Sequence, residues 1–189
     1  VRSFQNLQHF DYAGVQGRLL SSSYAPEKGQ PGHGPMLAEL RRTEPGRHHL
    51  FAFPAQSNFS GVQHPLEWIE RAKVLGWDVL LDAAAFVPTN RLDLSVHRPD
   101  FVAISFYKMF GYPTGVGCLL IRKAALPKLR RPWFAGGTVN FATVQGAMHV
   151  LSPGEAGFED GTLNYLGIPA VEIGLRHLEQ VGIDVIQTR

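Results

Sequence analysis

Apolar residues along this chain are gathered into short runs, separated by polar connections that are rich in glycine and proline. Four runs after residue 48 are long enough to predict buried β-strands. They are His49–Phe53, Asp78–Asp82, Asp100–Ser105 and Gly117–Arg122. Strands that are apolar along most of their length are typical of a sheet that is covered on both faces.

Two other segments, Pro65–Leu75 and Pro169–Val181, repeat their apolar residues with the period of an α-helix. Upstream, Ser21–Arg47 is rich in proline, glycine, serine and charged residues, which indicates a loop or a disordered insertion. One short helix is expected within it, at Met36–Arg42. We therefore divide the chain into a poorly defined N-terminal part with this loop-rich insertion, residues 1–48, and a core, residues 49–189.

The alternation of strands and helices in the core predicts an α/β fold with right-handed crossovers and a mostly parallel sheet flanked by helices. Ligands of such sheets bind where the carboxyl ends of the strands meet. Polar residues at three of these strand ends are therefore the candidates for chemistry. They are Gln56–Asn58, Asp82 and Ser105–Lys108.

Composition narrows the class of protein. The chain has 189 residues, of which 44% are hydrophobic and 18% are charged, which is ordinary for one globular unit. A net charge of +2 is too small to indicate a nucleic-acid partner, and the basic cluster Lys128–Arg131 is expected to be a solvated helix end. Neither a membrane partner nor a signal peptide is expected, because no apolar run approaches the roughly 20 residues that cross a bilayer. The single cysteine leaves no internal disulfide and fits a reducing cytoplasm.

Asp82 and Lys108 are more informative together than apart. Alone, Asp82 at the end of an apolar strand is explained by a helix cap or a loop hydrogen bond. Lys108 lies among aromatic residues, where burial would favour the neutral, nucleophilic amine. A lysine that extends its ammonium group to water explains this sequence equally well. As a pair they suit pyridoxal 5'-phosphate (PLP), which needs a lysine for its aldehyde and an acid for its pyridine nitrogen.

Several motifs in matching order resemble those of the class V aminotransferase and cysteine desulfurase family, and most closely the N-terminal domain of its molybdenum cofactor sulfurase branch. The motifs lie within about residues 49–180 and are Pro54–Gly61, Asp82–Ala85, Ser105–Lys108, Gly111–Gly117 and Phe158–Thr162. The resemblance implies the large domain of a fold-type I PLP enzyme, incomplete at both ends.

The resemblance also implies roles for the matching positions. Lys108 is similar to the lysine that holds PLP as a Schiff base and later shuttles a proton, and Asp82 to the partner of the pyridine nitrogen. Asn58 is similar to an asparagine that donates to the phenolic oxygen of the cofactor, and Ser105 to a serine that holds its phosphate. Thr138 lies in a loop similar to one that reaches the phosphate of a partner subunit, so a homodimer is implied. Without the resemblance, these three positions have ordinary explanations. Asn58 would be a turn asparagine, Ser105 a hydroxyl at a strand end, and Thr138 part of a plain tight turn.

Two positions depart from the family pattern. Ala85 stands where many desulfurases have glutamine, and Tyr107 where they have histidine, so Asn58 would act alone on the phenolic oxygen. Cys118 is expected to be a small hydrophobe in its strand, with a thiol pKa raised by burial, and not the persulfide nucleophile. The resemblance implies that the persulfide cysteine follows this chain, and that one phosphate loop and the residue stacked on the ring precede it.

The expected function is PLP-dependent sulfur transfer from L-cysteine, with alanine as the second product and this chain as a fragment of the large domain. In the molybdenum cofactor sulfurase branch the sulfur passes to the molybdenum centre. Two alternatives stay open: another class V PLP aminotransferase or lyase, and a non-catalytic, truncated PLP-fold module. The eight histidines are scattered and form no pattern of metal ligands, so no metal site is expected.

Overall fold

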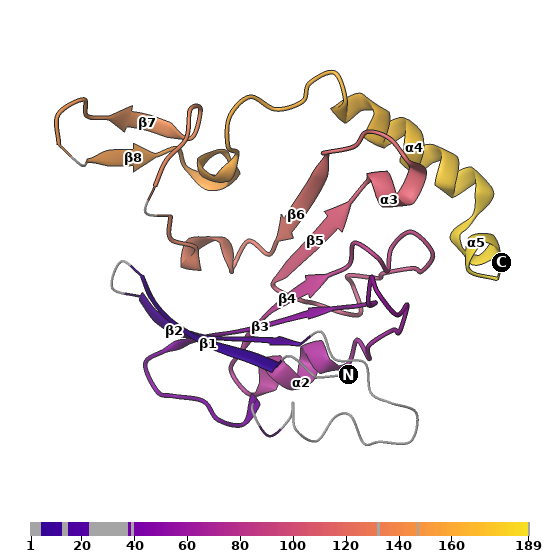
Figure 1. Ribbon diagram of the computed structural model, residues 1–189, viewed down its shortest axis with the longest axis horizontal. Helices are drawn as coiled ribbons and strands as arrows, with labels where there is room; N and C mark the ends of the chain where they lie inside the picture. The colour runs from indigo at the N-terminus through magenta and orange to yellow at the C-terminus, as the bar shows by residue number, and fades with distance from the viewer. Residues whose placement is uncertain are drawn as a thin grey trace.

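The computed structural model describes residues 5–12, 15–22, 38, 40–131, 133–146 and 148–188. Its main sheet has strand order β1-β2-β3-β4-β5-β6 (Figure 1). The strands are β1 (Gln5–Tyr12), β2 (Val15–Ser22), β3 (His48–Pro54), β4 (Asp78–Asp82), β5 (Phe101–Ser105) and β6 (Gly117–Ile121). The sheet is parallel from β2 to β5, whereas β1 and β6 pair with their neighbours antiparallel.

The remaining elements lie around this sheet. The helices are α2 (Trp68–Val74), α3 (Tyr107–Phe110), α4 (Ile168–Val181) and α5 (Ile183–Gln187), with 3-10 turns η1 (Leu126–Lys128) and η2 (Gly154–Phe158). Strands β7 (Val139–Ala142) and β8 (His149–Leu151) form a separate antiparallel hairpin. Figure 1 shows this hairpin and helix α3 on opposite sides of the molecule, with α4 beside α3. Among the described residues, no helix is both long and apolar enough to span a membrane.

The core lies between β3, β4 and α2. Phe51 and Phe53 of β3 are stacked 4.8 Å apart, and the ring of Trp68 from α2 lies 5.6 Å from Phe53. Burying a side chain of this size stabilises the fold by about 1.5–3 kcal/mol. Both strands alternate buried and less buried positions, so the described chain covers one sheet face more fully than the other. The second face is partly covered within the described residues, because most of its positions in β3 and β4 are intermediate in exposure.

Gly117 allows β6 to begin close to the end of β5. A Cβ atom at this position would lie 2.6 Å from the carbonyl oxygen of Ile104, far inside van der Waals contact. Gly117 pairs with Ser105, the last residue of β5. The glycine thus fixes the strand end from which the segment carrying Lys108 leaves the sheet.

The strands and helices predicted for the core are confirmed, with bounds that differ by a few residues at most. No element was predicted at β1, β2, β7 or β8. Within the helix expected at Met36–Arg42, Ala38 and Leu40 are helical, and Leu40 is buried in the core. Most of the loop expected at Ser21–Arg47 lies outside the described residues, and the division of the chain at residue 48 stays a prediction.

Candidate active site

The parallel register brings the ends of β3, β4 and β5 to one edge of the sheet. Asp82, the last residue of β4, is in register with Pro54 of β3 and Ala103 of β5. The Asp82 carbonyl accepts the N–H of Ala55 at 2.8 Å, and the Ala103 carbonyl accepts that of Ala83 at 3.0 Å. The segments that follow these strands therefore leave the sheet side by side, as the sequence predicts for three candidate positions.

Lys108 and Asn58 meet at this edge. The Lys108 Nζ donates to Asn58 Oδ1 at 2.9 Å, although the two residues are fifty positions apart. Lys108 is half-buried in α3 and Asn58 is exposed in the turn after β3. A carboxamide carries both an acceptor and two donors, so Asn58 can hold the lysine through its oxygen while Nδ2 donates to a ligand.

Helix α3 is held in place at its C-terminal end. It stops at Gly111, whose φ of 79° is left-handed and whose N–H donates to the Tyr107 carbonyl at 2.8 Å. The last helical residue, Phe110, packs against α4 at Gly174, where an added Cβ would lie 2.5 Å from the phenyl ring. This close approach supports the one-turn helix that carries Lys108.

Asp82 presents an exposed carboxylate at the same edge. Its Oδ1 accepts the backbone N–H of Ala84 at 3.0 Å, which is the loop hydrogen bond considered from the sequence alone. Within the described part of the chain, Oδ2 has no hydrogen-bond donor. The side chain can therefore stabilise its own turn and still offer an oxygen to a positively charged ligand atom.

Three further positions complete this edge. Ser105 ends β5 and is half-buried opposite Gly117. Ala85 lies in the turn after β4 and has no side chain that can donate, so Asn58 is the amide bonded to Lys108 at this edge. Tyr107, in the histidine position of the family pattern, is 45% exposed at the start of α3.

Thr138 is not brought to Lys108 within this chain. It precedes β7, on the other side of the molecule from α3 (Figure 1). Its side chain is fully buried, and its hydroxyl donates to the Ala135 carbonyl at 2.7 Å and accepts the Ala135 N–H at 3.0 Å. The hydroxyl therefore closes its own turn, at Gly137 with a φ of 84°. Its predicted contact with a partner's phosphate stays a prediction.

Arg131 ties this turn to the motif near residue 160, a role that the sequence analysis missed. Its guanidinium donates to the Gly157 carbonyl at 2.9 Å and forms an ion pair with Asp160. The Gly161 N–H in turn donates to the Gly136 carbonyl at 3.2 Å. The side chain of Arg131 is only 6% exposed, so the expectation of a solvated helix end is wrong at Arg131, whereas Lys128 at the end of η1 and Arg130 are exposed as expected. The partner Asp160 is distant in sequence, and the local charge pattern gives no sign of it.

Cys118 lies inside β6, paired with Ile104. Burial raises the pKa of its thiol above the ordinary value. This confirms the expected direction, and a protonated thiol is a poor nucleophile.

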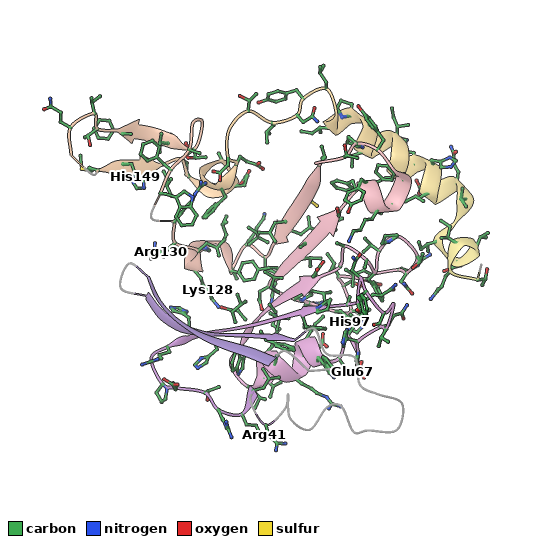
Figure 2. The ribbon with its side chains drawn as sticks, viewed as in Figure 1. Arg41, Glu67, His97, Lys128, Arg130 and His149 are labelled. Carbon is green, nitrogen blue, oxygen red and sulfur yellow. The ribbon has the colours of Figure 1, made fainter. Side chains whose placement is uncertain are left out.

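The described residues contain no group of three histidine, cysteine, aspartate or glutamate side chains that could hold a metal ion. Figure 2 shows two of the histidines far apart, with His97 near the main sheet and His149 on the β7–β8 hairpin, where its ring lies 5.1 Å from that of Phe134.

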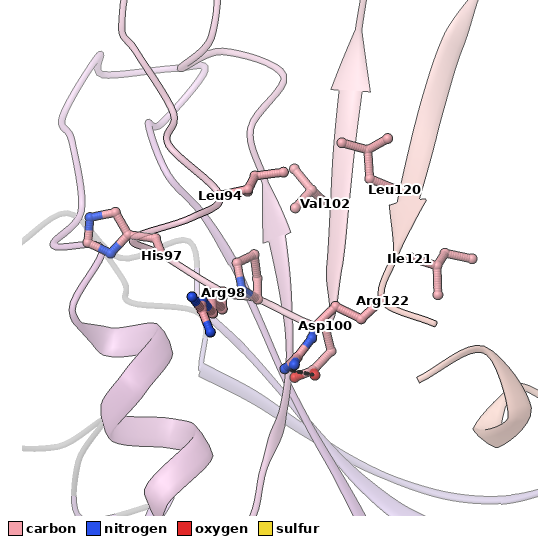
Figure 3. A pocket seen from close by; sticks show the side chains of 9 residues that line it. Leu94, His97, Arg98, Asp100, Val102, Leu120, Ile121 and Arg122 are labelled. Atoms are coloured by element: carbon pink, nitrogen blue, oxygen red, sulfur yellow. Dashed lines mark hydrogen bonds and ion pairs between the residues drawn. The ribbon is translucent and has the colours of Figure 1, made fainter. Parts of the chain in front are cut away.

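A cavity of about 350 Å³ lies at the opposite ends of the strands (Figure 3). It is lined by Arg98 and Arg122 beside Asp100, which directly precedes β5. The Asp100 carboxylate is already bonded to Arg122 at 3.5 Å, to Lys73 at 3.2 Å and to the N–H of Val79 at 3.0 Å. These charges hold strand ends together, so we assign the chemistry to the edge with Lys108 and not to this cavity.

Comparison with known sequences gives one family. A family model described as aminotransferase class-V matches residues 30–189. Molybdenum cofactor sulfurase of Caenorhabditis elegans is 47% identical over 135 residues, which cover 71% of this chain and 19% of that protein. The Homo sapiens molybdenum cofactor sulfurase is 48% identical over 143 residues, which cover 70% of this chain and 16% of that protein. The chain thus spans less than a fifth of the length of these curated relatives.

Comparison with solved structures agrees on the fold. The apo structure of a cysteine desulfurase from Thermococcus onnurineus NA1 matches with a TM-score of 0.63 and 30% identity, covering 78% of this chain and 36% of that one. The predicted fold class, the α/β large domain of fold-type I PLP enzymes, is confirmed for the matched part.

Proposed function

The chain belongs to the aminotransferase class-V family, and from this premise we propose that it is the PLP-binding core of an enzyme that removes sulfur from L-cysteine. When bound, PLP supplies an electron sink for negative charge at the α-carbon of an amino acid. The relatives named molybdenum cofactor sulfurase support the molybdenum cofactor as the destination of the sulfur. The observation that carries the proposal is the hydrogen bond between Lys108 and Asn58, beside Asp82.

The side chains at this edge fit the chemistry of PLP group by group. Lys108 offers the amine that an aldehyde requires, and Asp82 an acceptor for a protonated ring nitrogen. Asn58 Nδ2 would donate to the phenolic oxygen, and the Ser105 hydroxyl to the phosphate. Amine, carboxylate, amide and hydroxyl all come from the exits of three neighbouring parallel strands. That is where α/β sheets bind their ligands.

Each of these side chains has a stated task in the proposed reaction. Asn58 Oδ1 accepts a hydrogen bond from the Lys108 side-chain nitrogen and so fixes the direction in which Nζ points. Lys108, once its amine is free, would carry a proton to and from the α-carbon of the substrate. Asp82, exposed at the strand end, would hold a proton on the ring nitrogen. Cys118 lies inside strand β6 with a thiol pKa raised by burial, so we do not assign it as the sulfur acceptor.

Reductive trapping tests the cofactor assignment directly. The protein is incubated with PLP, reduced with borohydride, digested and analysed by mass spectrometry. We expect the pyridoxyl mass on the peptide that contains Lys108, together with a visible absorbance band before reduction. The variant Lys108→Ala should lose both, whereas Lys123→Ala, a change of an exposed lysine after β6, should keep both.

A pyridoxyl adduct spread over several lysines, with none favoured, would refute the assignment to Lys108. The reaction class is tested separately by supplying L-cysteine to the PLP-loaded protein and measuring alanine. A transfer of the amino group to a 2-oxo acid, without alanine from cysteine, would indicate an aminotransferase instead.

We also propose that the active form is a homodimer. The β7–β8 hairpin beside the Thr138 turn exposes large apolar side chains, all at least half accessible: Phe141, Val144, Met148 and Val150. A cluster of this kind on a protruding hairpin is typical of a protein–protein interface. Sedimentation should show a dimer that Phe141→Asp dissociates, whereas Val74→Asp on the exposed side of α2 should leave it intact. A monomeric, PLP-loaded wild type would refute the dimer.

A further inference from the structure

Asn90 is a buried side chain at the centre of an amide network next to the proposed site, and its glutamine partners reach it from the surface. It is only 5% exposed, in the connection that follows β4. Its Nδ2 donates to Gln56 Oε1 at 3.2 Å and to the Phe86 carbonyl at 3.1 Å. Its Oδ1 accepts from Gln63 Nε2 at 3.0 Å and from Gln187 Nε2 at 3.1 Å. Both donors and the acceptor oxygen of one side chain are thereby used.

Two of these partners are the residues that close the turn carrying Asn58. Gln56 and Gln63 face each other as an isolated antiparallel bridge, and their side chains are bonded at 3.3 Å. Inside this bridge, the Ser57 N–H donates to the Val62 carbonyl at 2.8 Å. Asn90 therefore bonds to both residues at the base of the turn, and Asn58 lies within that turn.

The same side chain is anchored to the exit of β4. The Phe86 carbonyl that accepts Asn90 Nδ2 also accepts the Asn90 backbone N–H at 2.9 Å. The Phe86 N–H in turn donates to the carbonyl of Ala83 at 3.0 Å, and Ala83 is the residue that follows Asp82. Asn90 thus joins the connection after β4 to the turn after β3, which are the two segments that present Asp82 and Asn58.

We propose that Asn90 is a positioning residue for the cofactor site, acting through Gln56 and Gln63 to hold the Asn58 amide against Lys108. The inference rests on the proposed function, because Asn58 matters through its contact with the lysine-bound cofactor. An amide is required at this position since it must donate and accept at once. Asn90→Asp keeps the shape and the oxygen that accepts from Gln63, and it removes the donors to Gln56 and to the Phe86 carbonyl.

The test follows the absorbance of the PLP-loaded protein as a function of pH. A donor on the phenolic oxygen draws negative charge away from the proton at Lys108 Nζ, so losing that donor makes the proton leave at higher pH. Asn58→Ala should therefore move the midpoint of the spectral change upward by about half to one pH unit, the size of one hydrogen bond. Asn90→Asp should move it in the same direction, by a smaller amount.

The double variant separates positioning from general damage. In the Asn58→Ala background, Asn90→Asp should produce no further shift, because its effect passes through Asn58. Asn140→Asp, the same change at an exposed position on β7, should leave the midpoint where it is. If Asn90→Asp does not fold, Gln63→Met removes one donor to Asn90 from the exposed side of the turn and should reproduce the shift.

Two results would overturn the inference. One is a midpoint that neither Asn90→Asp nor Gln63→Met changes, and the other is a shift that persists in full without Asn58. Failure of the proposed function looks different, because the wild type itself would then show no band and no reduced adduct at Lys108.

Discussion

Asp82 and Asp100 stand at opposite edges of the same sheet, one ending β4 and the other preceding β5, and they have opposite surroundings. The Asp100 side chain is 9% exposed and is bonded to Lys73, Arg122 and a backbone N–H. Asp82 is exposed and accepts one backbone N–H. A carboxylate whose bonds are all made within the protein is structural, whereas one with an oxygen to spare at the carboxyl ends of parallel strands can serve a ligand.

The largest effect that separates the two aspartates should come from Asp82→Asn. The amide keeps an oxygen for the Ala84 N–H, so the free energy of unfolding should change by less than about 0.5 kcal/mol. Loss of the charge beside the ring nitrogen should lower the rate of alanine release from cysteine by about 100-fold or more. Urea unfolding and the alanine assay measure the two quantities. An unchanged rate would remove Asp82 from the proposed site.

Asp100→Asn should show the reverse pattern. It leaves the ammonium of Lys73 and the guanidinium of Arg122 without their counter-charge. We expect a loss of about 2–3 kcal/mol in the free energy of unfolding, below the value for a fully buried pair because Arg122 is 45% exposed. At a temperature where the variant is folded, borohydride should still trap PLP on Lys108. Loss of trapping in the folded variant would contradict the division between the two edges.

Gly174→Ala tests how the ligand edge is supported. The added methyl group would overlap the ring of Phe110, so α3 or α4 must shift. Overpacking of this kind costs about 1–3 kcal/mol, and it should also weaken PLP binding because α3 carries Lys108. Thermal unfolding and PLP titration measure the two effects. For thermal unfolding the control is Gly136→Ala, at a position where a Cβ meets nothing within 4 Å, and it should leave the unfolding temperature unchanged.

The smallest effect concerns Cys118, one residue from Gly117 at the ligand edge but inside strand β6. Because burial raises its thiol pKa, the thiolate forms at higher pH in the folded protein than in the unfolded chain. Alkylation by iodoacetamide should therefore rise at a higher pH in the native protein than in urea. The raised pKa also links this thiol to stability. Its contribution to the free energy of unfolding is fully present below the unfolded-state pKa and is lost as pH rises through the folded-state pKa. A native profile at or below the unfolded one would contradict this.

The sequence predicted those parts of the molecule in which a local pattern reflects burial. Strands β3 to β6 are short apolar runs, and Asp82, Ser105 and Lys108 are the polar residues at their ends. Strands β1 and β2 were missed because polar residues interrupt them, and β7 and β8 because they are short. Asn90 could not be found this way, since its bonds reach Gln56 and Gln187, which are 34 and 97 positions away.

The order of the strands has a consequence for how the site is built during synthesis. Within the described residues, the sheet follows the chain from β1 to β6 without any strand inserted between earlier neighbours. Each strand that leaves the ribosome can therefore pair with an edge that already exists, and the segments bearing Asn58, Asp82 and Lys108 are made in that order. The lysine is the last of the three to emerge, so Asn58 and Asp82 are synthesised before the amine that would react with the aldehyde.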